Sequence, residues 1–133
     1  MMLFITIPGK INTNHRPRAT ARGGKVRTYK DAGYRKYLEH VRSSGVLGLV
    51  SSQLAADGSL ISTWRRDLRY SVVIVVHEPD RRSRDLDNFA KPILDGLTGV
   101  VWFDDRQIDD LHIRRGLVSA PNPNVFVSVE VIK

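Results

Sequence analysis

Two pairs of aspartates near the middle of the chain have the residue type and spacing for metal-dependent chemistry on phosphate. Asp85 and Asp87 stand two positions apart, and Asp104 and Asp105 are adjacent. Side chains at i and i+2 of an extended backbone point to the same side, and two carboxylates held together repel unless a cation joins them. Oxygen ligands of this kind suit Mg²⁺ or Mn²⁺. The pattern therefore indicates a divalent-metal site if the two pairs come together.

Both pairs also have simpler structural interpretations. An Asp at the start of a helix can cap free amides, which would explain one of Asp85 and Asp87 but not both. Asp is common in solvated turns, which would explain Asp104 and Asp105. The spacing does not match an EF-hand, because no Gly stands six positions on from Asp85 and no Glu twelve positions on.

Lys91, four residues after Asp87, is the candidate cation of this segment. One interpretation is a surface lysine paired with Asp95 at i+4. The other is a positive charge aimed at the scissile phosphate or the attacking water. The spacing differs from the acid-x-Lys pattern of restriction-type nucleases, so that motif is excluded.

The charge of the chain is unevenly distributed. The 133 residues carry a formal net charge of +7, from 21 Lys and Arg against 14 Asp and Glu. Residues 1–70 hold 13 basic and 4 acidic side chains, whereas residues 71–133 hold 8 basic and 10 acidic ones. The basic half favours a polyanion such as nucleic acid. Carboxylates beside it would repel phosphate, so they favour a metal-dependent enzyme over a simple binding protein.

Several classes of protein are excluded by composition. The chain has no cysteine, which removes disulfide frameworks, thiolate zinc sites and cysteine nucleophiles. Its longest apolar runs, 46–50 and 72–76, fall far short of the ~20 residues that span a bilayer. No basic region precedes an apolar stretch at the N-terminus. We expect a cytoplasmic protein with no membrane partner.

Hydrophobic periodicity predicts one α+β domain over residues 1–133, in the order β-α-β-α-β-β on a mixed sheet. The last strand is expected to pair antiparallel with the one before it, and the run 72–76 to be buried on both faces. Residues 9–27 form a basic loop or a hairpin closed by Gly23 and Gly24. A helix could continue from 46 to 56. The expected strands are 2–8, 69–77, 100–103, 109–118 and 125–131, and the expected helices are 29–43 and about 88–98.

Three motifs in the acidic half closely resemble the RusA family of Holliday junction resolvases. They are DRRSRDLDNFAK at 80–91, LDGLT at 94–98 and VWFDDRQI at 101–108. The central pattern is acid-Leu-acid-Asn, then a lysine, then an aspartate pair. The strand ending at Pro8, the loop Asn14-x-Arg16 and the pair Tyr34-Arg35 extend the similarity over most of the chain.

The resemblance implies a RusA-like fold and a homodimer that binds a four-way DNA junction, as bacterial and phage members do. Its two Mg²⁺-dependent sites would nick symmetric strands in recombination and repair, with Mn²⁺ as a possible substitute. Asp85, Asp87 and Asp105 match the family's essential carboxylates, which are both catalytic and metal-binding. Lys91 matches its functional lysine, and Asp104 matches in identity as a fourth candidate ligand.

The sequence also predicts a DNA-binding surface and leaves two other functions open. Basic residues in the segment 10–27 and before Asp85 are expected to hold the DNA backbone, so binding should weaken steeply with salt. The alternatives are a non-catalytic junction-binding protein of the same fold and a nuclease with broader branched-DNA or flap specificity. The candidate DNA-binding residues are Asn14, Arg16, Arg18, Arg22, Lys25, Arg27, Arg81, Arg82 and Arg84.

Overall fold

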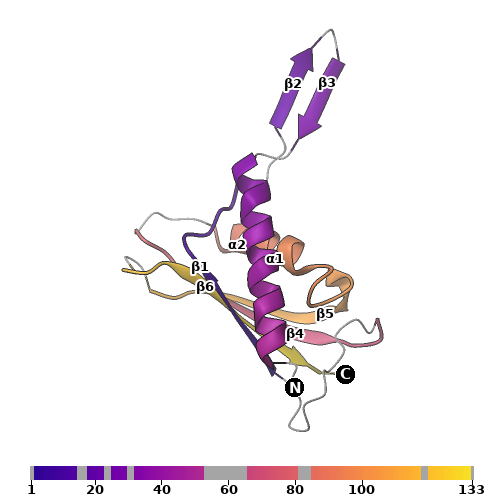
Figure 1. Ribbon diagram of the computed structural model, residues 1–133, viewed down its shortest axis with the longest axis vertical. Helices are drawn as coiled ribbons and strands as arrows, with labels where there is room; N and C mark the ends of the chain where they lie inside the picture. The colour runs from indigo at the N-terminus through magenta and orange to yellow at the C-terminus, as the bar shows by residue number, and fades with distance from the viewer. Residues whose placement is uncertain are drawn as a thin grey trace.

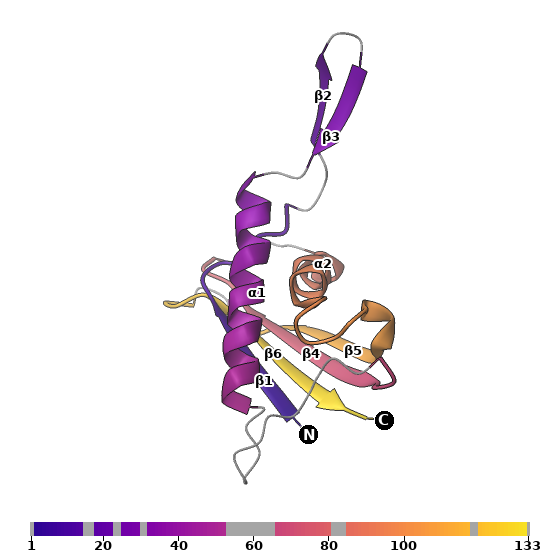
Figure 2. The same cartoon turned by 45° about the vertical axis from the view of Figure 1, so that its right-hand side comes forward.

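The computed structural model describes residues 2–14, 18–22, 25–29, 32–52, 66–80, 85–117 and 120–132. A four-stranded mixed sheet carries two helices on one face (Figures 1 and 2). The strand order is β1-β6-β4-β5, in which β4 and β5 are parallel and the other neighbours antiparallel. The strands are β1 (Met2–Pro8), β4 (Tyr70–His77), β5 (Ile108–Arg115) and β6 (Asn124–Val131). With the helices, the sheet confirms the order β-α-β-α-β-β.

Burial along β1, β4 and β6 alternates with period two. Leu3, Ile5 and Ile7 of β1 are buried, and the residues between them are exposed. In β4, Val72 is buried whereas Val73 is half-buried. The expected burial of 72–76 on both faces is therefore wrong, because the helices cover only one face of the sheet. A continuous apolar run does not distinguish these two cases.

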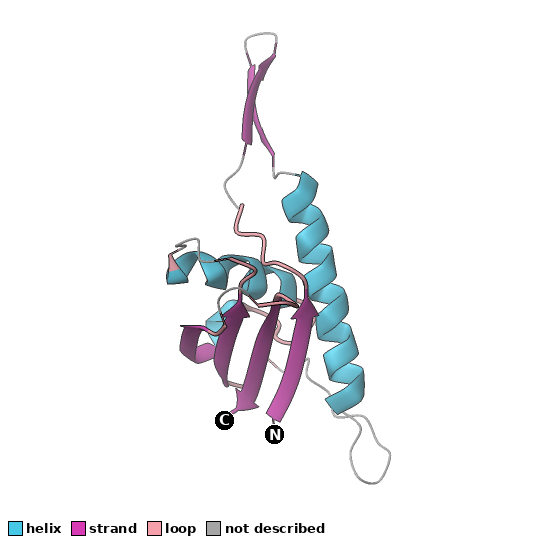
Figure 3. Cartoon of the chain, turned by 90° about the vertical axis from the view of Figure 1, so that its left-hand side faces the viewer, coloured by secondary structure: helices cyan, strands magenta, loops and turns pink. Residues whose placement is uncertain are grey.

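The pairing of the last strand also differs from expectation. β6 lies between β1 and β4, and β5 pairs with β4 alone, at the edge of the sheet (Figure 3). An alternating sequence predicts which residues share a face, but it carries no information about which strand is the neighbour. The antiparallel partners of β6 are therefore β1 and β4, and neither is the strand that precedes it in sequence.

Helix α1 (Ala32–Ser52) begins three residues later than expected and continues nine residues further. It starts later because Tyr29 ends strand β3, and its extension confirms part of the helix considered for 46–56. Its buried stripe includes Tyr34, Tyr37 and Val41, as the i, i+3 and i+7 spacing predicts.

Helix α2 (Leu86–Leu97) begins two residues before the predicted start and contains Pro92. Phe89, Ile93 and Leu97 are fully buried against the sheet, which confirms the i, i+4, i+8 stripe. Each turn of α2 therefore has one side fixed in the core, and its remaining residues face either α1 or solvent.

No strand forms at 100–103 within this described stretch. The backbone folds into a turn in which the amides of Val100 and Val101 both donate to the Leu97 carbonyl, at 3.0 and 2.9 Å. Gly99 has a positive φ of 86°, which glycine adopts without a Cβ clash. Trp102 is fully buried and makes only one isolated bridge, to Thr98. These apolar residues reach the core from a turn rather than from a strand. This explains why the run 100–103 has the apolar composition of a buried strand.

The basic segment after β1 contains a hairpin, β2 (Arg18–Arg22) and β3 (Lys25–Tyr29), which confirms that alternative for residues 9–27. It projects beyond the end of α1, away from the sheet (Figure 1). Arg22 pairs with Lys25, and Gly23 and Gly24, which are expected to close the hairpin, lie outside the described residues.

Candidate catalytic site between the two helices

Helices α1 and α2 approach closely because each has a glycine at the contact. A Cβ on Gly96 would lie 2.5 Å from Cγ1 of Val41, and a Cβ on Gly45 would lie 2.6 Å from Cδ2 of Leu97. Real Cβ atoms do not approach other atoms so closely, so any larger residue would push the helices apart. The two glycines therefore set the spacing of the residues that continue along the same faces.

Those faces form two walls of a cavity of about 440 Å³. On each helix the two lining residues are spaced i, i+4, so they are neighbours on a single face. The turn that follows α2 supplies the remaining lining. The cavity is lined by Leu38 and Arg42 of α1, Lys91 and Asp95 of α2, and Thr98, Asp104 and Asp105.

Lys91 and Asp95 form an ion pair across one turn of α2, with 3.3 Å between Nζ and Oδ1. Burial and then the negative charge of Asp95 raise the pKa of Tyr34 on α1 to about 12. The structural interpretation of Lys91 as the partner of Asp95 is thus correct. It does not exclude the functional one, because the pair lines the cavity that also contains Asp105.

Asp104 and Asp105, although adjacent, are held differently. Asp104 is the N-cap of the 3-10 turn η1 (Asp105–Gln107), and its Oδ1 accepts a hydrogen bond of 2.9 Å from the Arg106 amide. This bond is the main reason that the pKa of Asp104 lies below its ordinary value. Asp104 is therefore committed to the turn, in agreement with the structural interpretation, whereas Asp105 is exposed.

Gln107 fastens this turn to the body of the protein and is only 5% exposed. Its Oε1 accepts hydrogen bonds from the amides of Phe103 and Asp104, at 2.8 and 3.1 Å. Its Nε2 donates to the carbonyl of Leu68, just before β4, at 3.0 Å. Sequence reasoning missed Gln107, although Asp104-x-x-Gln107 has the spacing of a capping box and could have indicated it.

Arg69 holds the other side of the same turn, a role for which no sequence pattern provides a signal. Its guanidinium forms a two-pronged ion pair with Asp109 and donates to the Arg106 carbonyl at 2.9 Å. The turn that presents Asp105 is thus anchored at both ends to the segment that leads into β4.

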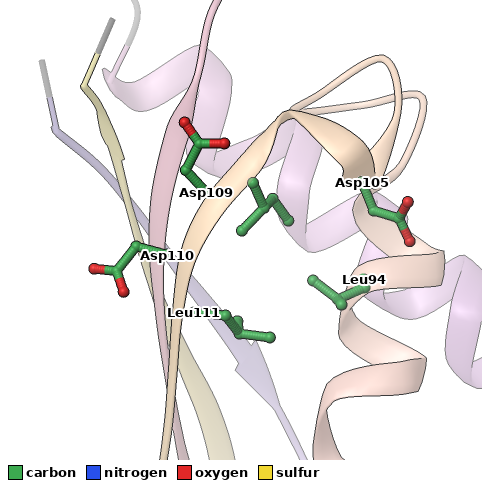
Figure 4. Close-up of a pocket in the computed structure, with 6 residues that line it drawn as sticks. Leu94, Asp105, Asp109, Asp110 and Leu111 are labelled. Atoms are coloured by element: carbon green, nitrogen blue, oxygen red, sulfur yellow. The ribbon is translucent and has the colours of Figure 1, made fainter.

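Asp105 also borders a second, smaller hollow of about 170 Å³ between α2 and β5. Figure 4 shows its carboxylate projecting from the turn beside Leu94, whereas Asp110 points away across β5. On that side of the strand, Asp110 accepts a hydrogen bond of 3.1 Å from the Ser71 hydroxyl. Asp105 is therefore the carboxylate shared by both hollows.

Asp85 and Asp87 lie at the beginning of α2 and are exposed. Asp85 has the extended backbone of an N-cap, but its side chain makes no capping hydrogen bond. Asp87 lies in the first turn, where the helix dipole favours a negative charge. Capping therefore does not account for Asp85, and the dipole accounts for Asp87 only in part.

Among the described residues, no group of three or more His, Cys, Asp or Glu side chains is close enough to hold a metal ion. Asp104 and Asp105 line the cavity with Lys91 and Asp95, and Asp85 and Asp87 lie at the beginning of α2. The expected approach of 104–105 to 85–87 and the ligand assignments stay predictions.

The candidate DNA-binding residues are only partly described. Asn14 is exposed, and its amide donates to Asn12 Oδ1 at 2.9 Å. Arg18 and Arg22 belong to strand β2, and Lys25 and Arg27 belong to strand β3. The backbone register pairs Arg22 with Lys25. Arg16, Arg81, Arg82 and Arg84 lie outside the described residues.

Together these features define a small α+β protein with a projecting basic hairpin and an acidic cavity, a combination suited to phosphodiester chemistry. The chain belongs to the RusA family, because the model described as endodeoxyribonuclease RusA matches residues 8–130. The resemblance seen in the motifs and the RusA-like fold are thereby confirmed. No helix in the described part of the chain is long and apolar enough to cross a membrane.

Curated relatives are bacterial and phage proteins named crossover junction endodeoxyribonuclease RusA. The chain is 49% identical to the one from Escherichia coli K12 over 41 residues, which are 30% of this chain and 34% of that protein. It is 40% identical to the one from Enterobacteria phage HK97 over 62 residues, 46% of this chain and 51% of that protein. The matches thus span between a third and a half of these relatives' length.

Proposed function

We propose that this chain is an Mg²⁺-dependent, structure-selective endodeoxyribonuclease that resolves Holliday junctions by paired symmetric nicks in DNA recombination and repair. The observation that carries the proposal is one cavity shared by Asp105 and Lys91, where an anchored turn holds an exposed carboxylate beside a cation. Membership of an endodeoxyribonuclease family supports the reaction, and the relatives' name supports the crossover junction as substrate.

The exposed aspartates suit Mg²⁺, with Mn²⁺ as a substitute, because carboxylate oxygens are the donors that these ions prefer. We propose Asp85, Asp87 and Asp105 as ligands. Asp104 is the weaker candidate, since its Oδ1 already accepts the Arg106 amide. The ion would activate a water and offset the charge that develops on the phosphodiester.

Lys91 would add a positive charge to the same cavity. Its ion pair with Asp95 holds the ammonium group on the cavity wall, which reduces the entropy lost when a phosphate binds. In this role Lys91 stabilises negative charge on the phosphate or orients the attacking water.

The β2–β3 hairpin would bind the DNA backbone outside the cavity. Its strands contain Arg18, Arg22, Lys25 and Arg27, and four basic residues can neutralise several phosphates, so affinity should fall steeply as salt rises. Lys and Arg contacts of this kind position the substrate without specifying its sequence.

We propose a homodimer as the working form. A four-way junction is two-fold symmetric, and a dimer with a two-fold axis presents two equivalent sites to it. The described residues of one chain form no group of three carboxylates, and a second copy would offer another source of them.

The test is cleavage by an Asp87→Asn variant. It should fail to nick a four-way junction in Mg²⁺ and still bind that junction, because the amide removes a ligand but none of the basic surface. Glu39→Gln, which makes the same charge change on an exposed part of α1, is the matched control and should cleave like the wild type. Normal cleavage by Asp87→Asn would refute the assignment of the site.

The non-catalytic alternative has one observation in its favour, the lack of a three-carboxylate group among the described residues of one chain. It predicts a purified dimer that binds junctions and never nicks them in Mg²⁺ or Mn²⁺. The broader nuclease predicts comparable cleavage of a junction and a flap. A mobile junction, a flap and a linear duplex cleaved side by side distinguish all three functions.

A further inference from the structure

Five charged side chains line the cavity between α1 and α2, and they are not equally available to a ligand. The cations are Arg42 and Lys91, and the carboxylates are Asp95, Asp104 and Asp105. Lys91 is paired with Asp95 at 3.3 Å, and Asp104 caps the turn η1. The two groups without such a commitment are therefore one carboxylate, Asp105, and one guanidinium, Arg42.

Arg42 is exposed at the wall formed by α1, one turn beyond Leu38 on the same face. It makes no ion pair or hydrogen bond with any residue in the described ranges. A guanidinium is always charged, and its planar fork of N–H donors matches the oxygens of a phosphate. An unpaired arginine opposite an exposed carboxylate suits an anionic ligand whose charge is shared between the arginine and a metal ion.

We propose that Arg42 binds a non-bridging oxygen of the DNA phosphate that is cleaved, across the cavity from Asp105. This inference rests on the proposed nuclease function and adds a substrate-binding residue to it. Arg42 differs from Lys91 because no carboxylate neutralises its charge, and because two parallel N–H bonds fix the orientation of a phosphate as well as its charge. Removing such a donor should slow the chemical step more than it weakens overall DNA binding.

The competing explanation is an ordinary solvated arginine on an exposed helix face. Lys36 provides the comparison, because it is exposed on the same helix and is absent from the cavity lining. Six residues before Arg42, it points about 120° away around the helix. If Arg42 contributes only to the general positive charge of α1, substitution of Lys36 and Arg42 should have equal effects.

The first measurement is single-turnover cleavage at saturating protein in Mg²⁺. Arg42→Ala should be about a hundredfold slower, Arg42→Lys intermediate, and Lys36→Ala unchanged. Guanidinium ion added to the buffer should accelerate Arg42→Ala and not the wild type. Equal rates for Arg42→Ala and Lys36→Ala would overturn the proposal. Arg42→Gln replaces the alanine variant if thermal unfolding shows that the latter is less stable.

The second measurement is junction binding in Ca²⁺, with a neutral methylphosphonate at the phosphate that the wild type cleaves. The wild type and Lys36→Ala should lose about tenfold in affinity, and Arg42→Ala should lose nothing further. An equal loss in Arg42→Ala would overturn the proposal.

The two failures are distinguishable. If the wild type nicks no substrate, the proposed function fails, and methylphosphonates placed in turn at each phosphate around the crossover still test Arg42 by binding. A loss of affinity that is present in the wild type and absent from Arg42→Ala supports the contact. A loss that is the same in both overturns it.

Discussion

The two acidic segments, Asp85–Asp87 and Asp104–Asp105, each contain two aspartates, but the local structure that holds those aspartates differs. Asp104 caps a short turn that Gln107 fastens to the segment before β4, so this segment presents one exposed carboxylate from a rigid support. Asp85 occupies an N-cap position without a capping bond, so the start of α2 presents two carboxylates with little structural role. Adjacent aspartates can thus be held differently, because Asp104 caps the turn and Asp105 is left exposed.

The start of α2 and the turn at 104–105 also differ in how they stabilise negative charge. At the start of α2, free amides and the helix dipole favour the two carboxylates. At the turn, a single amide is taken by Asp104, and Asp105 is left to solvent and to the cavity. We infer that the first segment is suited to binding an ion and the second to holding one carboxylate in a defined place.

The largest expected effect comes from mixing two inactive variants, Asp87→Asn and Asp105→Asn. If each ion is shared between copies, a mixed dimer has one site that lacks both aspartates and one that is intact. We expect either variant alone to lose cleavage at least ~10³-fold, and the exchanged mixture to recover nicking of one strand. Mixtures that stay inactive, although mass spectrometry shows mixed dimers, would place all three ligands in a single chain.

A smaller effect is expected from Gln107→Met, which keeps the size of the side chain and removes its hydrogen bonds. The amides of Phe103 and Asp104 and the carbonyl of Leu68 would lose their partner, so the free energy of unfolding should fall by about 2–3 kcal/mol. Urea denaturation measures this loss. Cleavage should also need more Mg²⁺, because Asp105 is no longer held.

Two further variants test whether Gln107 stabilises this turn. Arg106→Met alters an exposed residue of the same turn and should change stability by less than about 0.5 kcal/mol. Gln107→Glu keeps the acceptor for both amides and should be intermediate. An unchanged urea midpoint in Gln107→Met would mean that the turn does not depend on Gln107.

The smallest effect is a pH-dependent difference between the two capping positions. The pKa of Asp104 lies below its ordinary value of 3.8, so its ionised form stabilises the fold above that pH. This contribution is lost as the pH falls through the lowered pKa. Asp104→Ala should therefore unfold at a lower temperature than the wild type at pH 7, by an amount that shrinks below pH 3.8.

Asp85→Ala is the matched variant at the other segment, because Asp85 makes no capping bond. Its unfolding temperature should stay close to that of the wild type across the same pH range. Calorimetric scans of the three proteins give the comparison directly. A loss in Asp85→Ala equal to that in Asp104→Ala would remove the distinction between the segments.

Periodicity predicted the helices and the buried stripe of α2 well, since Phe89, Ile93 and Leu97 are all fully buried. It failed at 100–103, where apolar residues enter the core from a turn around Gly99. It also failed for the partner of β6, because pairing depends on contacts between distant segments. The capping box of Asp104 and Gln107 is a local pattern that sequence reasoning overlooked, whereas the bond from Gln107 to Leu68 could not be predicted because the two residues are 39 positions apart.

The sequence alone determined the family, the chemical types at the site and the separation of charge, because these depend on which residues are present and how they are spaced. The sequence specified which carboxylates are present, but it did not show which of them would stabilise the fold by hydrogen bonds. That division was decided only by the tertiary structure, because Asp104 and Asp105 differ in hydrogen bonds and not in composition. The Lys91–Asp95 pair follows from local i, i+4 spacing within α2, whereas the presence of Arg42 in the same cavity as Asp105 depends on the close packing of two helices at Gly45 and Gly96.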